Sequence, residues 1–445
     1  MSPQVSSGPT RALGEPQQAP FEDRLDWACA QDAADPLSAL RGCFALPRGA
    51  DGQPLRYLCG HSLGLAPLAA RAMIEAEVAD WESLGVRGHE YAHTPWIGYA
   101  EQLQPALAAL VGAQTHEVVA MNSLSVNLHL LLASFYRPKP ARRAILIEAG
   151  AFSSDRHVVA AQIRWHGFDP AHELIELAPR AGEDLIRTDD IEACIAAAGS
   201  RLALVLWPGV QHFTGQRFDL QRIAHAAHAV DCVVGFDLAH AIGNVPLSLH
   251  ADEADFAAWC SYKYLNAGPG ALGGAFVHER HLQRTDLPRL TGWWGHDPAS
   301  RFQMRPSFEP ARGAAGWAVS NPPIFSAAPL RASLPLFAEA GAEALRRKSL
   351  ALTAYLASLL TELAGGQLTL VTPADPAQRG CQLSLRIHAG AERARLLPQS
   401  LFERGVVCDW RSPDIIRMAP VPLYNRFEDV LRGARQLGEI LRAQR

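Results

Sequence analysis

The chain has 445 residues, a formal net charge of −4, 48 % hydrophobic residues and 19 % charged residues. These values are typical of a globular protein with a large core, and they exclude a wholly disordered chain. The slightly acidic balance argues against nucleic acid as a partner. No apolar run approaches the ~18 residues that a membrane-spanning helix needs, so a membrane partner is not expected either.

Arginine strongly outnumbers lysine. Lysine and arginine together number 41, but only three lysines occur, namely Lys139, Lys263 and Lys348. Because arginine fills nearly every cationic position, a lysine points to chemistry that needs a primary amine, such as attack on a carbonyl. The simpler alternative is that the lysines are scattered survivors of a coding bias. Lys139, in a Pro-flanked loop, and Lys348, expected on a polar helix face, fit that alternative.

The first third of the chain is expected to be mainly helical. Residues 1–25 are expected to form a flexible arm, because residues 1–20 lack the apolar stretch of a signal peptide. A short strand and a glycine-rich turn at 56–67 precede helical periodicity at 68–84 and again at 98–111.

The middle third alternates short apolar runs with amphipathic helices. Such alternation predicts an α/β fold with a mostly parallel sheet covered on both faces, and places functional loops at the carboxyl ends of the strands. From about Pro335, a long helix, further strands and a final amphipathic helix predict a smaller α+β domain. The expected strands of the middle third are 144–149, 203–209, 232–237 and 255–262.

Two strand ends carry a carboxylate and a lysine. Asp237 ends one expected strand and is followed by His240, and Lys263 ends the next. This placement suits pyridoxal phosphate, since a lysine binds the cofactor covalently and an aspartate keeps the pyridine nitrogen protonated, which makes the ring an electron sink. A buried Asp–Lys salt bridge explains the spacing equally well. The scarcity of lysine favours the cofactor.

A phosphate needs N–H donors at a helix start. The segment 122–125, Asn-Ser-Leu-Ser, precedes an apolar helix and supplies such donors, although an ordinary N-cap is the simpler interpretation. Gly64 is a weaker candidate. The glycines at 268, 270 and 273 match the dinucleotide-binding pattern, but a strand-like segment follows them, so they are interpreted as a turn between strands.

Other catalytic centres are not favoured. His89 and His93 have helical metal-ligand spacing, in the segment HEYAH, but Pro95 follows closely, so no metal is expected. A serine nucleophile is not favoured either. The eight cysteines include no C-x-x-C pair and are expected to be reduced, as in a cytoplasmic protein.

Several long segments together resemble the kynureninase family. They include FDLAHAIGN, WCSYKYLNAG, GWWGH, SNPP and IRMAPVPLYN, together with YLCGHSLGL, MNSLSVNLHLLL, AFSSD and GVQHFTGQ. The resemblance runs in order from about residue 25 to the end. It implies a fold-type-I enzyme, usually a homodimer with shared active sites. Such an enzyme uses pyridoxal phosphate to hydrolyse L-kynurenine or 3-hydroxykynurenine to an anthranilate and L-alanine, in tryptophan catabolism and NAD biosynthesis. The implied organisation is a segment 26–60 packed on the small domain, a large domain 61–330 and a small domain 331–445.

The resemblance also implies roles for individual residues. Lys263 matches the lysine that binds the cofactor, Asp237 the partner of its pyridine nitrogen, and Phe152 the aromatic stacked on its ring. Tyr262 matches a cofactor contact and is a candidate proton donor. The further cofactor contacts are Leu124, Ser125, Ser153, Ser154, Asp155, His240, Trp293 and Asn321, of which Trp293 and Asn321 are expected from the partner subunit. The substrate contacts are His89, Ser320, Asn321 and Arg417, the last gripping the substrate carboxylate.

The resemblance also bears on which substrate the protein prefers and on which other activities are possible. His89, Ser320 and Asn321 resemble the set of family members that favour 3-hydroxykynurenine, so we expect that preference. Pro208 replaces a serine of some relatives, which changes cofactor anchoring. The rivals are another fold-type-I enzyme, such as an aminotransferase or a cysteine desulfurase with Cys59 as its mobile thiol, and a binding module, which would typically have lost the lysine or its acidic partner.

Overall fold

The computed structural model describes residues 21–284 and 286–443. Residues 1–20 of the expected N-terminal arm lie outside this range. Its centre is a seven-stranded sheet in the order β2-β8-β7-β6-β5-β3-β4. The pairs from β7 through β6, β5 and β3 to β4 are parallel, and only β8 with its neighbours β7 and β2 is antiparallel. The strands are β2 Val118–Ala120, β3 Ala144–Glu148, β4 Leu174–Leu177, β5 Leu202–Pro208, β6 Val233–Asp237, β7 Phe256–Trp259 and β8 Gly274–Val277.

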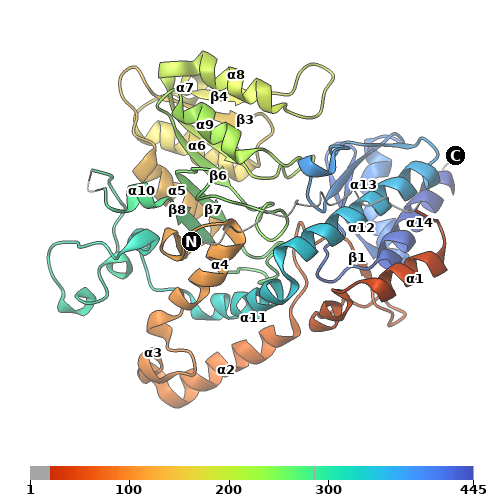
Figure 1. Cartoon of the computed structure of the whole chain (residues 1–445), viewed down its shortest axis with the longest axis horizontal. Coiled ribbons are helices and arrows are strands. Elements are labelled where there is room, and N and C mark those ends of the chain that lie inside the picture. The colour runs from red at the N-terminus through yellow and green to blue at the C-terminus, as the bar shows by residue number, and fades with distance from the viewer. Residues whose placement is uncertain (1–20, 285, 444–445) are drawn as a thin grey trace, which may run out of the picture.

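Helices cover both faces of this sheet (Figure 1). Alternate residues of one strand belong to different cores, as in β5, where Val205 and Trp207 pack on one face and Leu204 and Leu206 on the other. This burial on both sides explains the nearly unbroken apolar strands of the sequence. One face carries α4 Gln104–Val111, α8 Thr188–Ala198, α9 Leu220–His228 and α11 Ile324–Ala340, and the other carries α5 Leu124–Phe135 and α6 Ser153–Trp165.

The carboxyl-terminal part forms a second unit, in which a sheet packs against helices around its own hydrophobic core. Its antiparallel sheet has the order β12-β13-β10-β9, and the last helix packs against α12. The strands are β9 Leu368–Leu370, β10 Leu383–Ile387, β12 Asp409–Arg411 and β13 Ile415–Met418, and the helices are α12 Ala342–Leu363, α13 Ala391–Glu403 and α14 Phe427–Ala443.

The start of the described chain packs against this second unit. Helix α1 (Leu25–Ala34) packs on α14, and β1 (Arg56–Tyr57) pairs in parallel with β11 (Val406–Val407). The ring of Phe21 lies 5.4 Å from that of Tyr355 in α12. Chain segments from opposite ends of the sequence therefore build one unit.

Lys348 is not on a polar helix face, so that sequence interpretation was wrong. It lies in α12 with its side chain 6 % exposed, and its Nζ is 2.7 Å from Oδ2 of Asp35, which is 5 % exposed. The lysine ties the amino-terminal segment to the carboxyl-terminal unit through a buried ion pair. A buried cation without such a partner costs free energy, so the ion pair with Asp35 explains how a lysine is accommodated at this buried position.

A projecting arm of the molecule consists of α2 (Leu68–Leu84) and the short α3 (Gly88–Tyr91), and α2 runs along α11 (Figure 1). Trp81 is 59 % exposed on this arm. The remaining short helices are α7 Pro170–Glu173 and α10 Glu279–Leu282.

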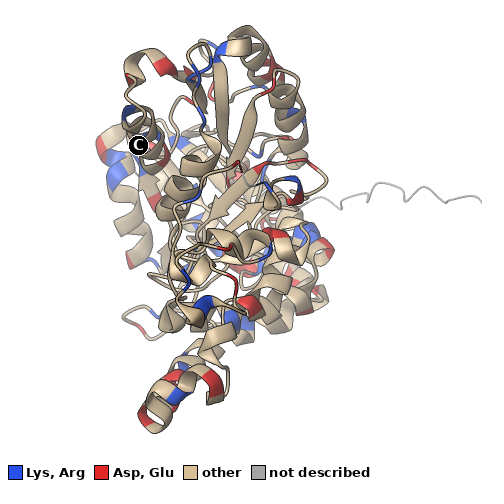
Figure 2. Cartoon of the chain, turned by 90° about the vertical axis from the view of Figure 1, so that its left-hand side faces the viewer, with Lys and Arg blue, Asp and Glu red and all other residues tan. Residues whose placement is uncertain are grey.

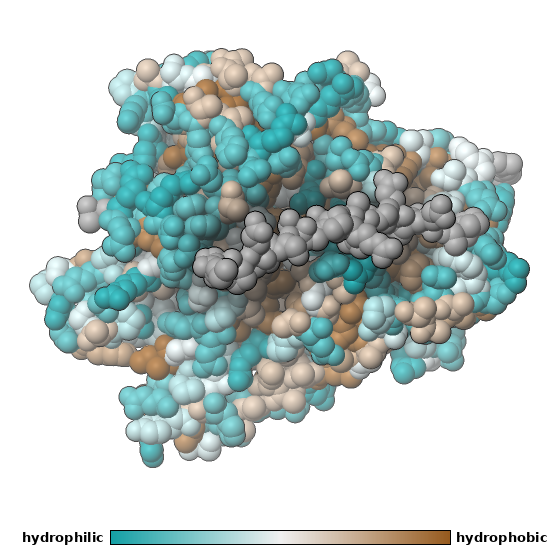
Figure 3. All heavy atoms as spheres, viewed as in Figure 1, coloured by the Kyte–Doolittle hydropathy of each residue, from teal (hydrophilic) through white to brown (hydrophobic). Residues whose placement is uncertain are grey.

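The surface carries mixed charge. Basic and acidic residues are interspersed on the side shown in Figure 2. The face in Figure 3 is largely hydrophilic with scattered apolar residues. Among the described residues, no helix has the length and apolar character that crossing a membrane requires.

Candidate active site

A cavity of about 270 Å³ opens at the carboxyl ends of β3, β5, β6 and β7. This is the edge of a parallel sheet at which functional loops are expected to converge. The structure brings Asp237 and Lys263 together there, as their strand-end positions predicted. The other predicted residues at this cavity are Leu124, Ser125, Phe152, Ser154, Asp155, His240 and Tyr262, and Ser153 is the neighbouring first residue of α6.

Asp237 is one of the residues that line the cavity. It is the last residue of β6 and is 7 % exposed, and its Oδ1 accepts the N–H of Ala239 at 2.7 Å. Burial and the neighbouring Asp237 carboxylate raise the pKa of Asp155 well above its ordinary value. Burial also raises the pKa of Glu148 to about 8. Glu148 therefore keeps its proton at neutral pH, and its surroundings favour the protonated form of Asp155.

Lys263 lies close to two aromatic rings. It is 9 % exposed, and its Nζ lies 5.8 Å from the ring centroid of Phe152 and 5.6 Å from that of Tyr262. Among the described residues, the one lysine ion pair is that of Lys348. The Asp–Lys salt bridge that the spacing also allowed is therefore not formed.

Two helix starts also line the cavity. Ser123 precedes α5 but makes no side-chain capping bond, so the ordinary N-cap interpretation does not hold. Ser125 in the first turn of α5 and Ser154 in the first turn of α6 lie with their Oγ atoms 2.6 Å apart. First-turn N–H groups lack partners within their helix, so two helix dipoles and two hydroxyls offer a site for an anion such as a phosphate.

These groups fit pyridoxal phosphate. The anion site, the Asp237 carboxylate, the Lys263 amine and the Phe152 ring all line the same cavity. His240 Nδ1, at the same cavity, is buried and has no hydrogen-bond partner among the described residues. This nitrogen can therefore form a hydrogen bond with a bound ligand. Pro208 ends β5 opposite Asp237. The N–H of the following Gly209 bonds to the Asp237 carbonyl at 2.7 Å, so the missing N–H of proline does not interrupt this strand end.

Arg417 lies behind the cavity rather than among its lining residues. It is 1 % exposed in β13, and its cross-strand partner is Asp409 in β12. The guanidinium binds both oxygens of Asp409 and donates from Nη1 to the carbonyl of His212 at 2.6 Å. Of its five N–H groups, these bonds use three and leave one on each terminal nitrogen. That end-on pair matches the two oxygens of a carboxylate.

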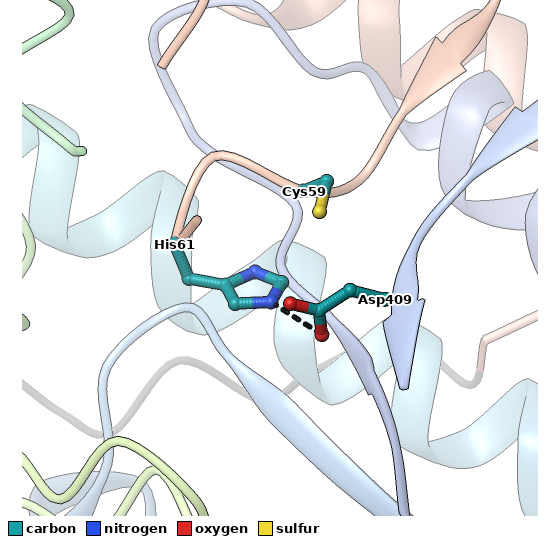
Figure 4. Close-up of side chains that lie close together, drawn as sticks. All are labelled: Cys59, His61 and Asp409. Carbon is teal, nitrogen blue, oxygen red and sulfur yellow. Dashed lines mark hydrogen bonds and ion pairs between the residues drawn. The ribbon is translucent and has the colours of Figure 1, made fainter. Parts of the chain in front are cut away.

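Figure 4 shows Asp409 beside two further polar side chains, His61 and Cys59. His61 Nε2 lies 3.0 Å from Asp409 Oδ1. Burial and the neighbouring Arg417 lower the pKa of His61 to about 4, so His61 stays neutral. Arg417 and Arg411 already oppose the charge of Asp409, and a metal cation between these residues would meet two guanidinium groups.

Besides Arg417, four predicted residues do not line the cavity within this chain: His89, Trp293, Ser320 and Asn321. His89 packs edge-on against the ring of Trp96, 5.5 Å away. Ser320 lines a separate small cavity, and Trp293 is 48 % exposed.

Sequence reasoning missed three neighbours of the site: Glu148, His212 and Asp409. Glu148 ends β3, and its strand-end position was the signal that could have singled it out. His212 stands in the motif GVQHFTGQ, which was recognised only as a whole. Asp409 had no sequence signal, because its importance comes from pairing with Arg417 across a hairpin.

Two glycine patterns have structural roles. A side chain at Gly64 would meet the Lys263 carbonyl at 2.2 Å, so glycine there allows the chain to pack against the lysine turn, and its N–H bonds to the Tyr262 carbonyl. The turn with Gly268 and Gly270 joins β7 to β8, as the sequence predicted. His93, which has metal-ligand spacing from His89, contacts Asp80.

Comparisons with known proteins support one family. The model described as "Kynureninase C-terminal domain" matches residues 345–437. A protein named "Kynureninase" from Xanthomonas campestris pv. campestris (strain B100) is 57 % identical over 403 residues, covering 91 % of this chain and 95 % of the relative. One from Myxococcus xanthus (strain DK1622) is 54 % identical over 421 residues, covering 94 % and 97 %.

Solved structures show the fold. The cystine C-S lyase C-DES with glycine covalently linked to its PLP cofactor matches with a TM-score of 0.73 at 19 % identity, over 85 % of this chain and 96 % of that one. The cysteine desulfurase CsdA from Escherichia coli matches with a TM-score of 0.72 at 17 % identity, over 92 % and 98 %. The predicted fold-type-I architecture is thereby confirmed.

Proposed function

This chain belongs to the kynureninase family, and from that premise we propose that it prefers 3-hydroxykynurenine and works as a homodimer. The enzyme uses pyridoxal phosphate to hydrolyse the side chain of a kynurenine-type amino acid, releasing an anthranilate and L-alanine. The observation that carries this function is the meeting of Lys263, Asp237 and two helix starts at one cavity. The roles of the individual residues below are part of the proposal.

The cofactor, when bound, supplies a carbonyl for covalent attachment and a ring that accepts electrons. Lys263 Nζ would hold it covalently, and the same amine would take the proton from the substrate α-carbon. Asp237 holds the proton on the pyridine nitrogen, which requires an anion. The protonated Glu148 adds no second negative charge beside Asp237.

Arg417 orients the substrate through its carboxylate. The bidentate contact with Asp409 fixes the plane of the guanidinium, so its two remaining N–H groups have a defined direction. Because Arg417 is only 1 % exposed, a substrate reaches it from the cavity side, past His212. Tyr262 at the same cavity is a proton donor, and burial raises the pKa of its phenol, which keeps the proton in place until it is needed.

A second copy of the chain would supply the groups that this cavity lacks. Exposed apolar side chains support such an interface, among them Trp81 at 59 % and Trp293 at 48 %. In the proposed dimer Trp293 and Asn321 reach the cofactor site of the other copy, and Asn321, with His89 and Ser320, binds the 3-hydroxyl group. A polar site of this kind disfavours an analogue without the hydroxyl, whose absence leaves polar groups unpaired.

The remaining expectations stand as parts of the same proposal. The domain boundaries are 26–60, 61–330 and 331–445, the enzyme is cytoplasmic, and it serves tryptophan catabolism or NAD biosynthesis. A cysteine desulfurase activity is not favoured. Cys59 is 7 % exposed, and burial raises the pKa of its thiol to about 12, whereas a persulfide-forming cysteine must be an accessible thiolate.

The substrate proposal is tested by measuring kcat/KM for kynurenine and 3-hydroxykynurenine side by side. We expect the hydroxylated substrate to be favoured at least tenfold, and Asn321→Ala to reduce that ratio. Ser307→Ala, on an exposed loop, is the control and should leave the ratio unchanged. A preference for plain kynurenine would overturn the proposal without affecting the family assignment.

A further inference from the structure

His212 is a side chain of the cavity to which neither the motif nor the family resemblance gave a role. It stands in the loop after β5, and its ring meets that of Phe152 edge-on at 5.3 Å and that of His240 at 6.4 Å. Hydrogen bonds of the preceding residue, Gln211, hold this loop in place. Gln211 donates to the Glu148 carboxyl group at 3.3 Å and accepts the N–H of Thr214 at 2.8 Å. The position of the imidazole is therefore well determined.

The hydrogen bonds of His212 fix its tautomer. Its Nε2 lies 3.2 Å from the carbonyl oxygen of Gly150, and a carbonyl only accepts, so Nε2 carries the hydrogen. Burial, Arg417 and Lys263 lower the pKa of His212 to about 4, so the ring is neutral. Nδ1 is then a bare lone pair, and it is buried without a hydrogen-bond partner among the described residues. A buried acceptor of this kind is costly unless a ligand supplies a donor.

The backbone of the same residue touches the carboxylate-binding group. The His212 carbonyl accepts from Arg417 Nη1 at 2.6 Å and from Gln382 at 3.1 Å. An α-amino acid carries its ammonium group two bonds from its carboxylate. A carboxylate held by Arg417 therefore brings the ammonium group into the neighbourhood of the His212 ring.

We propose that His212 Nδ1 accepts a hydrogen bond, and then a proton, from the α-ammonium group of the entering substrate. This inference rests on the proposed role of Arg417. An ammonium nitrogen has no lone pair and cannot attack a carbon. Transfer breaks one N–H bond of the ammonium, forms Nδ1–H and leaves a neutral amine beside an imidazolium. His212 passes the proton back to solvent when the product leaves.

The charges around His212 govern this transfer. Arg417 and Lys263 oppose protonation in the empty site, and the incoming carboxylate neutralises the Arg417 charge. The basicity of His212 thus rises when substrate is present to donate. The titratable groups that surround the ring come from five elements and are Glu148, His240, Lys263, Arg411 and Arg417.

A pH profile separates proton transfer from mere packing. His212→Phe keeps the edge-on ring contact with Phe152 and removes the acceptor. We expect its kcat/KM to fall about a hundredfold near pH 7. The deficit should shrink above about pH 8, where more of the free amino acid is already an amine. Gln382→Met, which removes the other bond to the His212 carbonyl, should change kcat/KM by a factor that does not vary with pH. A pH-independent deficit in His212→Phe would overturn the proposal.

Proton release on ligand binding gives a second readout without turnover. L-Alanine binding to the cofactor-loaded protein is followed by calorimetry in buffers of different ionisation enthalpy. The wild type should keep the ammonium proton on His212, whereas His212→Phe should release about one proton more to the buffer. Equal release would contradict the inference. If Arg417→Lys leaves the affinity for L-alanine unchanged, the proposed role of Arg417 fails instead, so the two failures are distinguishable.

Discussion

Glu148→Gln provides a quantitative test of the carboxyl group arrangement beside the cofactor site. Glu148 is 2 % exposed, its one side-chain partner is the Gln211 amide, and burial raises its pKa to about 8. A folded-state pKa above the unfolded value of about 4.3 means that the unfolded chain releases a proton that the folded chain retains. Stability is therefore lost as the pH rises between these two values. The loss amounts to about 1.4 kcal/mol per pH unit, or about 2.7 kcal/mol between pH 5 and pH 7.

Glutamine has the shape of the protonated acid but no proton to lose. The free energy of unfolding of Glu148→Gln relative to wild type should therefore rise by roughly 2–3 kcal/mol between pH 5 and pH 7. Urea unfolding of the cofactor-loaded protein at both pH values measures it. Glu439→Gln, whose side chain is 49 % exposed, is the control and should show no comparable change. A difference that is the same at both pH values would show that Glu148 is ionised in the folded protein and refute the reasoning.

Three further changes probe other parts of the site. Asp409→Asn removes the charge that orients Arg417, so KM should rise about tenfold or more with a smaller change in kcat, and an unchanged KM would exclude this positioning role. Ser125→Ala removes one hydroxyl from the phosphate site and should weaken cofactor binding about tenfold, measured by dialysis and absorbance, whereas unaltered affinity would place the phosphate elsewhere. Mixing inactive Lys263→Arg and Trp293→Ala dimers should restore activity that neither has alone, because one site of the hybrid is intact, and no recovery after subunit exchange would argue against shared sites.

The central sheet and its catalytic edge could be predicted from the sequence because both depend on local patterns. Apolar strands buried on both faces are nearly continuous runs, and their carboxyl ends mark the functional edge of a parallel sheet. Asp237 is the last residue of β6, and Lys263 stands in the segment directly after β7, which ends at Trp259. Their meeting in the structure follows from topology alone.

What escaped prediction depends on contacts between distant segments. The sequence pattern placed Lys348 on a polar helix face, but in the structure it is buried in an ion pair with Asp35, more than 300 residues away. The Asp409–Arg417 pair depends on the register of the β12–β13 hairpin, which a two-residue slip would destroy. The bare Nδ1 of His212 depends on the position of the Gly150 carbonyl. None of these is encoded in a local motif.

The most direct test of the account is the reaction itself. Purified protein with its cofactor is given 3-hydroxykynurenine, and the released aryl amine and L-alanine are quantified beside the Lys263→Arg variant, in which a guanidinium keeps the charge but cannot bind the cofactor covalently. The account predicts equal amounts of 3-hydroxyanthranilate and L-alanine from the wild type, and neither product nor the visible absorbance of the bound cofactor from the variant. Substantial turnover by Lys263→Arg, or other products from the wild type, would contradict it.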